Sequence, residues 1–179
     1  DPASVGRRAA DRALRRLGAK RVATCEVPIL FDEMTAPSLI GQLTSCLSGY
    51  SVYRESSFLA QRMGESIASS LVTIIDDGRL PGRLGSKPFD GEGLATRRKA
   101  IVADGVLETW LLDSYSGRKL GLPSTGNASR GPGSAPSVGA CNVWLEPGSQ
   151  PPDALIADTP RRLLVTELMG LGCNPTTGD

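Results

Sequence analysis

Two adjacent carboxylates, Asp32 and Glu33, lie in the stretch FDEMTAPSLIGQL at residues 31–43, between an apolar segment and a segment with helical periodicity. A carboxylate at such a junction can act as a general acid or base, or can bind a cation. The residue types found elsewhere in the chain decide which of these chemistries is available.

The chain contains no histidine, and this excludes several kinds of catalytic site. A Ser-His or Cys-His nucleophile cannot be built, nor can a zinc site with imidazole ligands. A carboxylate pair, a Ser-Lys pair and an all-oxygen cation site stay open. Ser116 and Lys119, on a predicted helical turn, are the candidate Ser-Lys pair. Asp76-Asp77-Gly78 is interpreted as a turn, because it lacks the further acidic positions of a calcium loop.

The four cysteines are far apart and include no C-x-x-C pair; they are Cys25, Cys46, Cys141 and Cys173. This spacing excludes a zinc ribbon and argues against a disulfide framework. Cys25 and Cys46 lie on apolar patterns, so we expect both to be buried as small apolar side chains. Free thiols predict a reducing, cytoplasmic compartment.

Length and composition indicate one globular domain. The 179 residues include 21 Gly and 13 Pro, which predicts many turns, and the low aromatic content of 4% leaves the core to aliphatic side chains. With 20 basic and 19 acidic residues, the chain has no global field to attract nucleic acid. No apolar run is long enough to cross a membrane. Because the sequence begins with Asp and lacks a signal segment, we expect a fragment or mature piece.

Hydrophobic periodicity predicts an α+β domain, with a strand-rich mixed or antiparallel sheet and a few packed helices. The expected helices cover 2–17, 36–48, the region of Phe58 to Met63, 114–121 and 151–160. The expected strands cover 22–31, 71–75, 138–148 and 161–170. Asp104-Gly105, between two β-rich runs, predicts a type I′ hairpin because both turn residues need positive φ.

The first predicted helix has two different faces. Its apolar face carries Val5, Ala9, Ala13 and Leu17, and its other face carries Arg7, Arg8, Arg12, Arg15 and Arg16. Since no aromatic residues are interleaved, the arginines predict a solvated or acid-paired face rather than a nucleic-acid site. The second predicted helix is expected to bury Leu39, Ile40, Leu43 and Leu47.

Residues 121–137 form a Gly/Ser/Pro-rich loop that shows no periodicity. Loops of this length are either functional or disordered. Composition leaves a mobile linker and a binding loop equally open.

Four strings, in this order, resemble the TldD/PmbA family, whose members are also labelled modulators of DNA gyrase: SVYRESSF, PFDGEG, LLDSYSGRKLGLPSTGNASRG and LLVTELMGLGCNPTTGD. The resemblance is to the PmbA (TldE) branch and covers nearly the whole chain. It implies that residues 1–179 form a single partial domain, similar to the N-terminal part of the family's largely β C-terminal domain. The 121–137 loop belongs to this domain.

In the metal-bearing TldD branch, the helix after the corresponding strand carries His-Glu-x-x-x-His, which holds zinc and supplies a general base. The resemblance places these positions near Glu33, Met34 and Ser38, and such side chains cannot replace two imidazoles on zinc. We therefore expect no catalytic and no metal-binding residue in this chain. Zinc is expected only in a TldD-like partner.

The resemblance also implies partners and a substrate. A PmbA-type chain associates with a TldD-type chain or with itself, and the assembly cleaves peptides or unfolded segments. Thr125, Gly126 and Asn127 match the family's T-G-N and are predicted to form a wall of the peptide cleft, with a simple turn as the alternative. Two other hypotheses stay open: a self-sufficient Ser-Lys hydrolase and a DNA- or gyrase-associated module. We expect no nucleic-acid or membrane partner.

Overall fold

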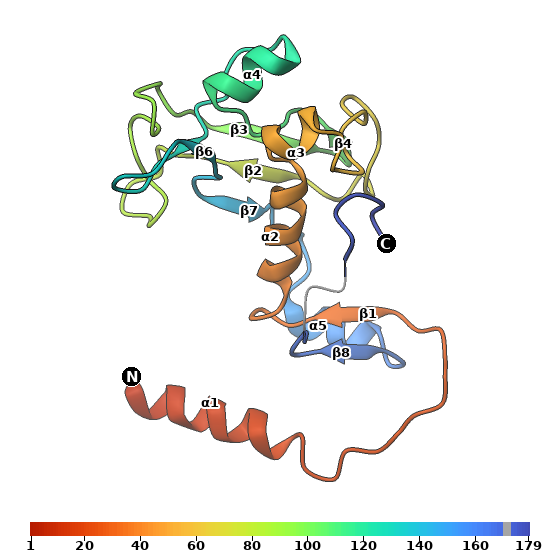
Figure 1. Cartoon of the computed structure of the whole chain (residues 1–179). Coiled ribbons are helices and arrows are strands. Elements are labelled where there is room, and N and C mark those ends of the chain that lie inside the picture. Colours follow the sequence, from red (N-terminus) through yellow and green to blue (C-terminus); the bar gives the residue numbers. More distant parts are fainter. Residues whose placement is uncertain (170–172) are drawn as a thin grey trace.

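A computed structural model describes residues 1–169 and 173–179 of the chain (Figure 1). Its helices are α1 (Pro2–Leu14), α2 (Ala36–Cys46), α3 (Gly49–Tyr53), α4 (Ser114–Leu120) and α5 (Pro152–Asp158). Its strands are β1 (Ile29–Phe31), β2 (Ile74–Asp76), β3 (Lys99–Ala103), β4 (Val106–Leu107), β5 (Ala128–Ser129), β6 (Ser137–Val138), β7 (Val143–Leu145) and β8 (Leu163–Val165). The described residues therefore form an α+β domain, as predicted.

The main body is a four-stranded antiparallel sheet with the order β4-β3-β2-β7. The central strand β2 aligns Ile74 with Val102 of β3 and with Leu145 of β7. The β3–β4 connection is the predicted hairpin turn, because Asp104 and Gly105 have φ values of 47° and 83°.

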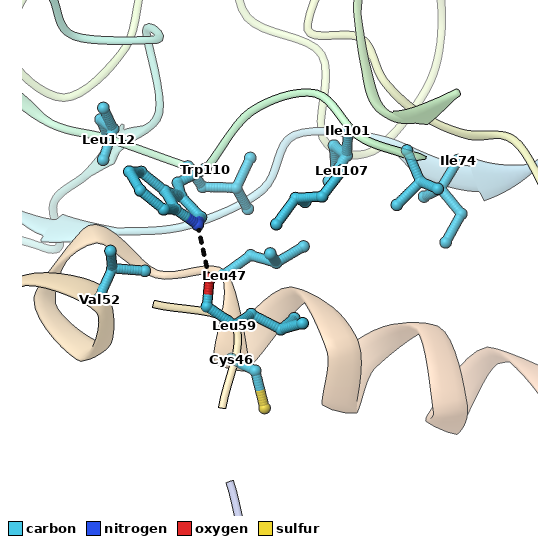
Figure 2. Close-up of a cluster of buried hydrophobic side chains, with 11 residues drawn as sticks. Cys46, Leu47, Val52, Leu59, Ile74, Ile101, Leu107, Trp110 and Leu112 are labelled. Carbon is cyan, nitrogen blue, oxygen red and sulfur yellow. Dashed lines mark hydrogen bonds between the residues drawn. The ribbon is translucent and has the colours of Figure 1, made fainter. Parts of the chain in front are cut away.

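One apolar cluster joins this sheet to α2, α3 and the segment before α4 (Figure 2). Its fully buried members include Leu47, Leu59, Ile101 and Leu107. Trp110 belongs to the same cluster, and its Nε1 donates a hydrogen bond to the Leu59 carbonyl at 3.2 Å. A buried indole N–H needs such an acceptor, so this bond fixes the ring within the core.

The second part of the molecule is smaller and less buried. Strands β1 and β8 form a two-stranded parallel ladder with Ile29 opposite Leu163, and α2 runs from this ladder to the main sheet (Figure 1). Helix α1 lies on the far side of the ladder and buries none of its residues. Polar contacts must therefore position α1.

Several element predictions need correction. The expected strand at 22–31 is ordered as a strand only over Ile29–Phe31, because its single neighbour β8 is equally short. The expected helix near Phe58 is a series of turns, since the Phe58 N–H donates to the Pro175 carbonyl at 2.9 Å and the Leu59 N–H to Ser57 Oγ at 3.1 Å. The strand expected at 161–170 is limited to β8, and its last position, 170, lies outside the described residues.

The predicted buried faces are also only partly right. Ile40, Leu43 and Leu47 pack in or against the core, whereas Leu39 is 40% exposed. The first helix forms as predicted from its periodicity, but none of the residues of α1 is buried. Cys46 is buried as expected but Cys25 is exposed, and all four cysteines are free thiols.

In the described residues, no helix is both long and apolar enough to span a membrane. The 121–137 loop is more ordered than its composition suggests, because β5 within it pairs with β6 at its end, with Ser129 opposite Ser137.

The hairpin glycine yields a stability prediction. A Cβ at Gly105 would lie 2.7 Å from the Ser69 carbonyl oxygen in a backbone with φ of 83°, so Gly105→Ala combines backbone strain with a backbone clash. We expect it to lower the free energy of unfolding by about 2 kcal/mol or more, measured by urea denaturation.

Gly93→Ala is the matched control, because Gly93 has φ of 84° and open space around its Cβ position. The free energy of unfolding of this variant should fall only by the cost of the left-handed backbone conformation, about 1 kcal/mol. Equal losses for the two variants would show that the close approach at Gly105 contributes nothing.

Candidate functional site: the strand-to-helix junction and the T-G-N loop

Asp32 follows β1 directly and holds the turn that leads into α2. Its Oδ1 accepts hydrogen bonds from the backbone N–H groups of Met34 and Thr35 at 3.1 and 2.8 Å. Its Oδ2 accepts from Arg12 Nη1 of α1 at 2.6 Å. The carboxylate therefore fixes the backbone after β1 and attaches α1 at the same point.

These contacts change the acidity of Asp32. Desolvation alone would raise its pKa, but the hydrogen bonds from Thr35 and Arg12, with the charge of Arg12, outweigh it and hold the pKa below its usual value. Asp32 is therefore a stable anion and a poor proton donor at neutral pH.

Arginines of α1 and of the turn that follows it bind acceptors at the ends of β1 and β8. Arg8 pairs with Glu33 at 3.7 Å, and Arg16 pairs with Glu167. Arg12 also donates to the Thr166 carbonyl at 2.5 Å. This confirms the prediction of an acid-paired face.

Two cavities flank the junction, and both are lined by Arg12 and Phe31. The larger, of about 710 Å³, lies between the start of α2 and the segment after β8, with Met34, Ser38 and Leu168 in its wall. The smaller, of about 530 Å³, lies between α1, β1 and α5. The junction is therefore the wall between two spaces large enough for peptide side chains.

The side chains at the positions that correspond to the zinc motif of the TldD branch do not suit zinc. Glu33 is 80% exposed and turned to Arg8, and Ser38 Oγ donates to the Thr35 carbonyl at 2.7 Å. Met34 contributes only a thioether, which is a poor ligand for Zn²⁺. No group of three or more His, Cys, Asp or Glu side chains that could hold a metal occurs among the residues described.

The T-G-N residues lie inside the main body. Thr125 and Asn127 are buried, and Thr125 Oγ1 accepts from the Leu112 N–H and donates to Asn127 Oδ1, both at 2.7 Å. A Cβ on Gly126, where φ is 72°, would lie 2.7 Å from the Ala95 carbonyl oxygen. The side chains thus hold a tight turn, and their role in a cleft wall stays a prediction.

Asn127 connects this turn to a buried ion pair that the sequence did not reveal. Its Nδ2 donates to Asp76 Oδ2 at 2.8 Å and to the Gly139 carbonyl at 3.1 Å. The same Asp76 oxygen binds Lys99 Nζ at 2.9 Å, and its Oδ1 accepts from the Cys141 N–H at 2.7 Å. The sequence predicts a turn at Asp76, but Asp76 is the last residue of β2 and is fully buried, because its partners come from distant segments.

The proposed Ser-Lys pair has other partners. Ser116 is fully buried, and its Oγ donates to Asp113 Oδ1 at 2.6 Å as part of a capping box at the start of α4. Lys119 Nζ instead lies 5.6 Å from the centre of the Tyr115 ring. The structure thus gives no support to a Ser-Lys nucleophile.

Known proteins share this arrangement. The sequence profile of the PmbA/TldA metallopeptidase C-terminal domain matches residues 24–179. The chain belongs to the PmbA/TldD family. Metalloprotease PmbA of Escherichia coli O157:H7 is 39% identical over 179 residues, which are 99% of this chain and 38% of that relative.

Solved structures of the PmbA/TldD family agree with the fold. A Thermotoga maritima protein described as a modulator of DNA gyrase gives a TM-score of 0.89 at 30% identity, over 99% of this chain and 41% of its own. TldE of Thermococcus kodakarensis gives a TM-score of 0.73 at 29% identity, over 89% of this chain and 38% of its own. The chain thus spans about two-fifths of these relatives.

The attachment of α1 should depend on pH. Because the pKa of Asp32 is lower in the folded state, its contribution is present above the unfolded value of about 3.9 and is lost as the pH falls through the folded pKa. We expect hydrogen-exchange protection of α1, corrected for intrinsic rates, to decrease over this acidic range.

Asp32→Asn should reduce this protection already at neutral pH and remove most of the acid dependence. Glu33→Gln is the control, because its pair with Arg8 is exposed and contributes little. If the two variants gave the same protection, Asp32 would not be the anchor of α1.

The Asn127 network should be sensitive to charge. Asn127→Ala leaves buried hydrogen-bond partners unsatisfied. It should lower the free energy of unfolding, measured by urea denaturation, by about 1–3 kcal/mol. Asn127→Asp should cost more at neutral pH, because a second carboxylate would face Asp76, and should recover part of the loss in acid. Wild-type stability of Asn127→Asp at neutral pH would contradict the network.

Proposed function

We propose that this chain is part of a metal-free, PmbA/TldE-like subunit of a peptidase assembly that acts on peptides or unfolded segments. The zinc and the general base would belong to a TldD-like partner. The observation that carries this proposal is the state of the junction: the chain has no imidazole, Asp32 is paired with Arg12, and Glu33 faces Arg8 in an exposed pair.

The donor set explains why the junction would not serve as a zinc site. To bind zinc, the Asp32 carboxylate would have to give up its hydrogen bonds with the Arg12 guanidinium at 2.6 Å and with two backbone N–H groups. Catalytic zinc is usually held by three protein ligands that include imidazoles. The chain therefore keeps the strand-to-helix geometry while its polar groups perform structural roles.

Peptide binding is supported by the open ladder and the cavities. Within the described residues, β1 and β8 pair only with each other, so each has an edge on which an extended peptide could form backbone hydrogen bonds. The cavities beside the junction could receive side chains of that peptide. Thr125, Gly126 and Asn127 would contribute indirectly, by holding the loop that forms another wall.

The test compares the full-length protein alone with the protein mixed with a TldD-like chain. Alone, it should contain no stoichiometric zinc by mass spectrometry and should not cleave an unfolded fluorogenic peptide. The mixture should form a complex, contain zinc and cleave the peptide.

Two variants assign the chemistry within the complex. Glu→Gln in the His-Glu-x-x-x-His motif of the partner should abolish cleavage, because the general base is lost. Glu33→Gln in this chain should leave the rate within about twofold, since Glu33 binds only an exposed arginine. Zinc-dependent cleavage by the isolated protein would overturn the proposal.

A further inference from the structure

All three tyrosines of the chain meet at one place on the surface. Tyr50 and Tyr53 belong to α3, Tyr115 belongs to α4, and each pair of ring centres is 5.9 Å apart. Tyr50 and Tyr115 are stacked, and Tyr53 meets Tyr115 edge to face. Tyr115 is 41% exposed, so the cluster is a surface feature.

A close approach of α3 and α4 makes this cluster. A Cβ on Gly49 would lie 2.6 Å from the Cβ of Ser116 and 2.8 Å from Cδ2 of Leu112, so only glycine permits the contact. The Gly49 N–H donates to the Leu111 carbonyl at 2.8 Å. The rings are therefore held by rigid backbone.

Tyr50 is further fixed by a buried carboxylate. Its hydroxyl donates to Asp113 Oδ2 at 3.0 Å, and Asp113 Oδ1 accepts a hydrogen bond from Ser116 Oγ. Desolvation, together with this hydrogen bond, raises the pKa of Tyr50, so the phenol stays protonated.

Two cations lie over the rings. The Arg54 guanidinium carbon is 5.5 Å from the centre of the Tyr53 ring and 5.9 Å from that of Tyr50, and Lys119 Nζ is 5.6 Å from that of Tyr115. Arg54 Nε also donates to the Tyr53 hydroxyl at 3.1 Å. Neither cation takes part in an ion pair within the described part of the chain.

Two acids that contact the residues of this surface are already hydrogen-bonded. Asp113 accepts from Tyr50 and Ser116, and Glu92 accepts from the Ser114 N–H at 2.8 Å. The surface therefore carries two positive charges, Arg54 and Lys119, beside aromatic rings, and Glu55 next to Arg54 is an exposed acid. Tyrosine and arginine are also the residues that most often dominate binding energy at protein interfaces.

We propose that this surface, formed by Tyr50, Tyr53, Arg54, Tyr115 and Lys119, binds an acidic peptide segment of a partner protein. Carboxylates of the segment would pair with Arg54 and Lys119, and its apolar or proline residues would lie on the rings. The ring contacts hold both cations in place before binding, which reduces the entropy lost on association. The surface is distinct from the strand-to-helix junction.

The test measures fluorescence anisotropy of a labelled peptide made of Glu, Pro and Leu with the full-length protein. The wild-type protein should bind this peptide, and the affinity should fall as salt is added. A peptide with Gln in place of Glu should bind at least about tenfold more weakly.

Arg54→Gln and Lys119→Gln should each weaken binding of the Glu peptide about tenfold, and Tyr53→Phe about threefold. These surface changes leave the core intact, which circular dichroism would check. Arg97→Gln is the matched control for charge, because Arg97 is exposed outside the cluster, and it should bind like the wild type.

Several results would overturn the proposal. These are equal binding of the Glu and Gln peptides, unchanged binding by Arg54→Gln and Lys119→Gln, or no binding of the Glu peptide. Tighter binding of a single-stranded DNA oligonucleotide through the same residues would assign the surface to nucleic-acid phosphates. Loss of a dimer in the Arg54→Gln variant, measured by sedimentation, would assign it to a second copy of the chain.

Discussion

Buried carboxylates that are fully supplied with donors organise the main body of this protein. A charged group removed from water is tolerated only when partners replace its hydration, and Asp76 obtains them from Lys99, Asn127 and the Cys141 backbone. Asp90 accepts from three backbone N–H groups, including that of Ala128 at 3.0 Å. Asp76 thereby connects β2 to the loops that carry Asn127 and Cys141, and Asp90 connects its own loop to β5.

The smaller part of the molecule is attached by a different kind of interaction. Helix α1 buries no residue; its arginines pair with Asp32 and Glu33, and Arg16 in the turn after it pairs with Glu167. Exposed pairs of this kind contribute little to stability and are weakened by salt. Helix α1 is therefore held on the ladder of β1 and β8 by interactions that salt would weaken.

At the strand-to-helix junction, the polar side chains make structural contacts. The strand, the turn and the helix are present, and the carboxylate of Asp32 holds the turn before α2 and anchors Arg12. A separate aromatic and cationic surface on α3 and α4 is built just as rigidly, through the close approach at Gly49. The family relationship thus places the chain in a peptidase family without placing the chemistry in this part of it.

The sequence alone determined the α+β class, the hairpin at Asp104-Gly105 and the absence of imidazole chemistry, because these follow from local periodicity, local φ requirements and composition. It also correctly indicated that the arginines would meet acids, but it could not name them. It did not reveal the partners of Asp76 or the contact of Tyr50 with Tyr115, and it did not reveal that α1 is exposed. The contacts concerned join residues that are 23 to 154 positions apart in the chain. Only the tertiary structure decided them, because burial and hydrogen bonding between distant segments leave no periodic signal in the chain.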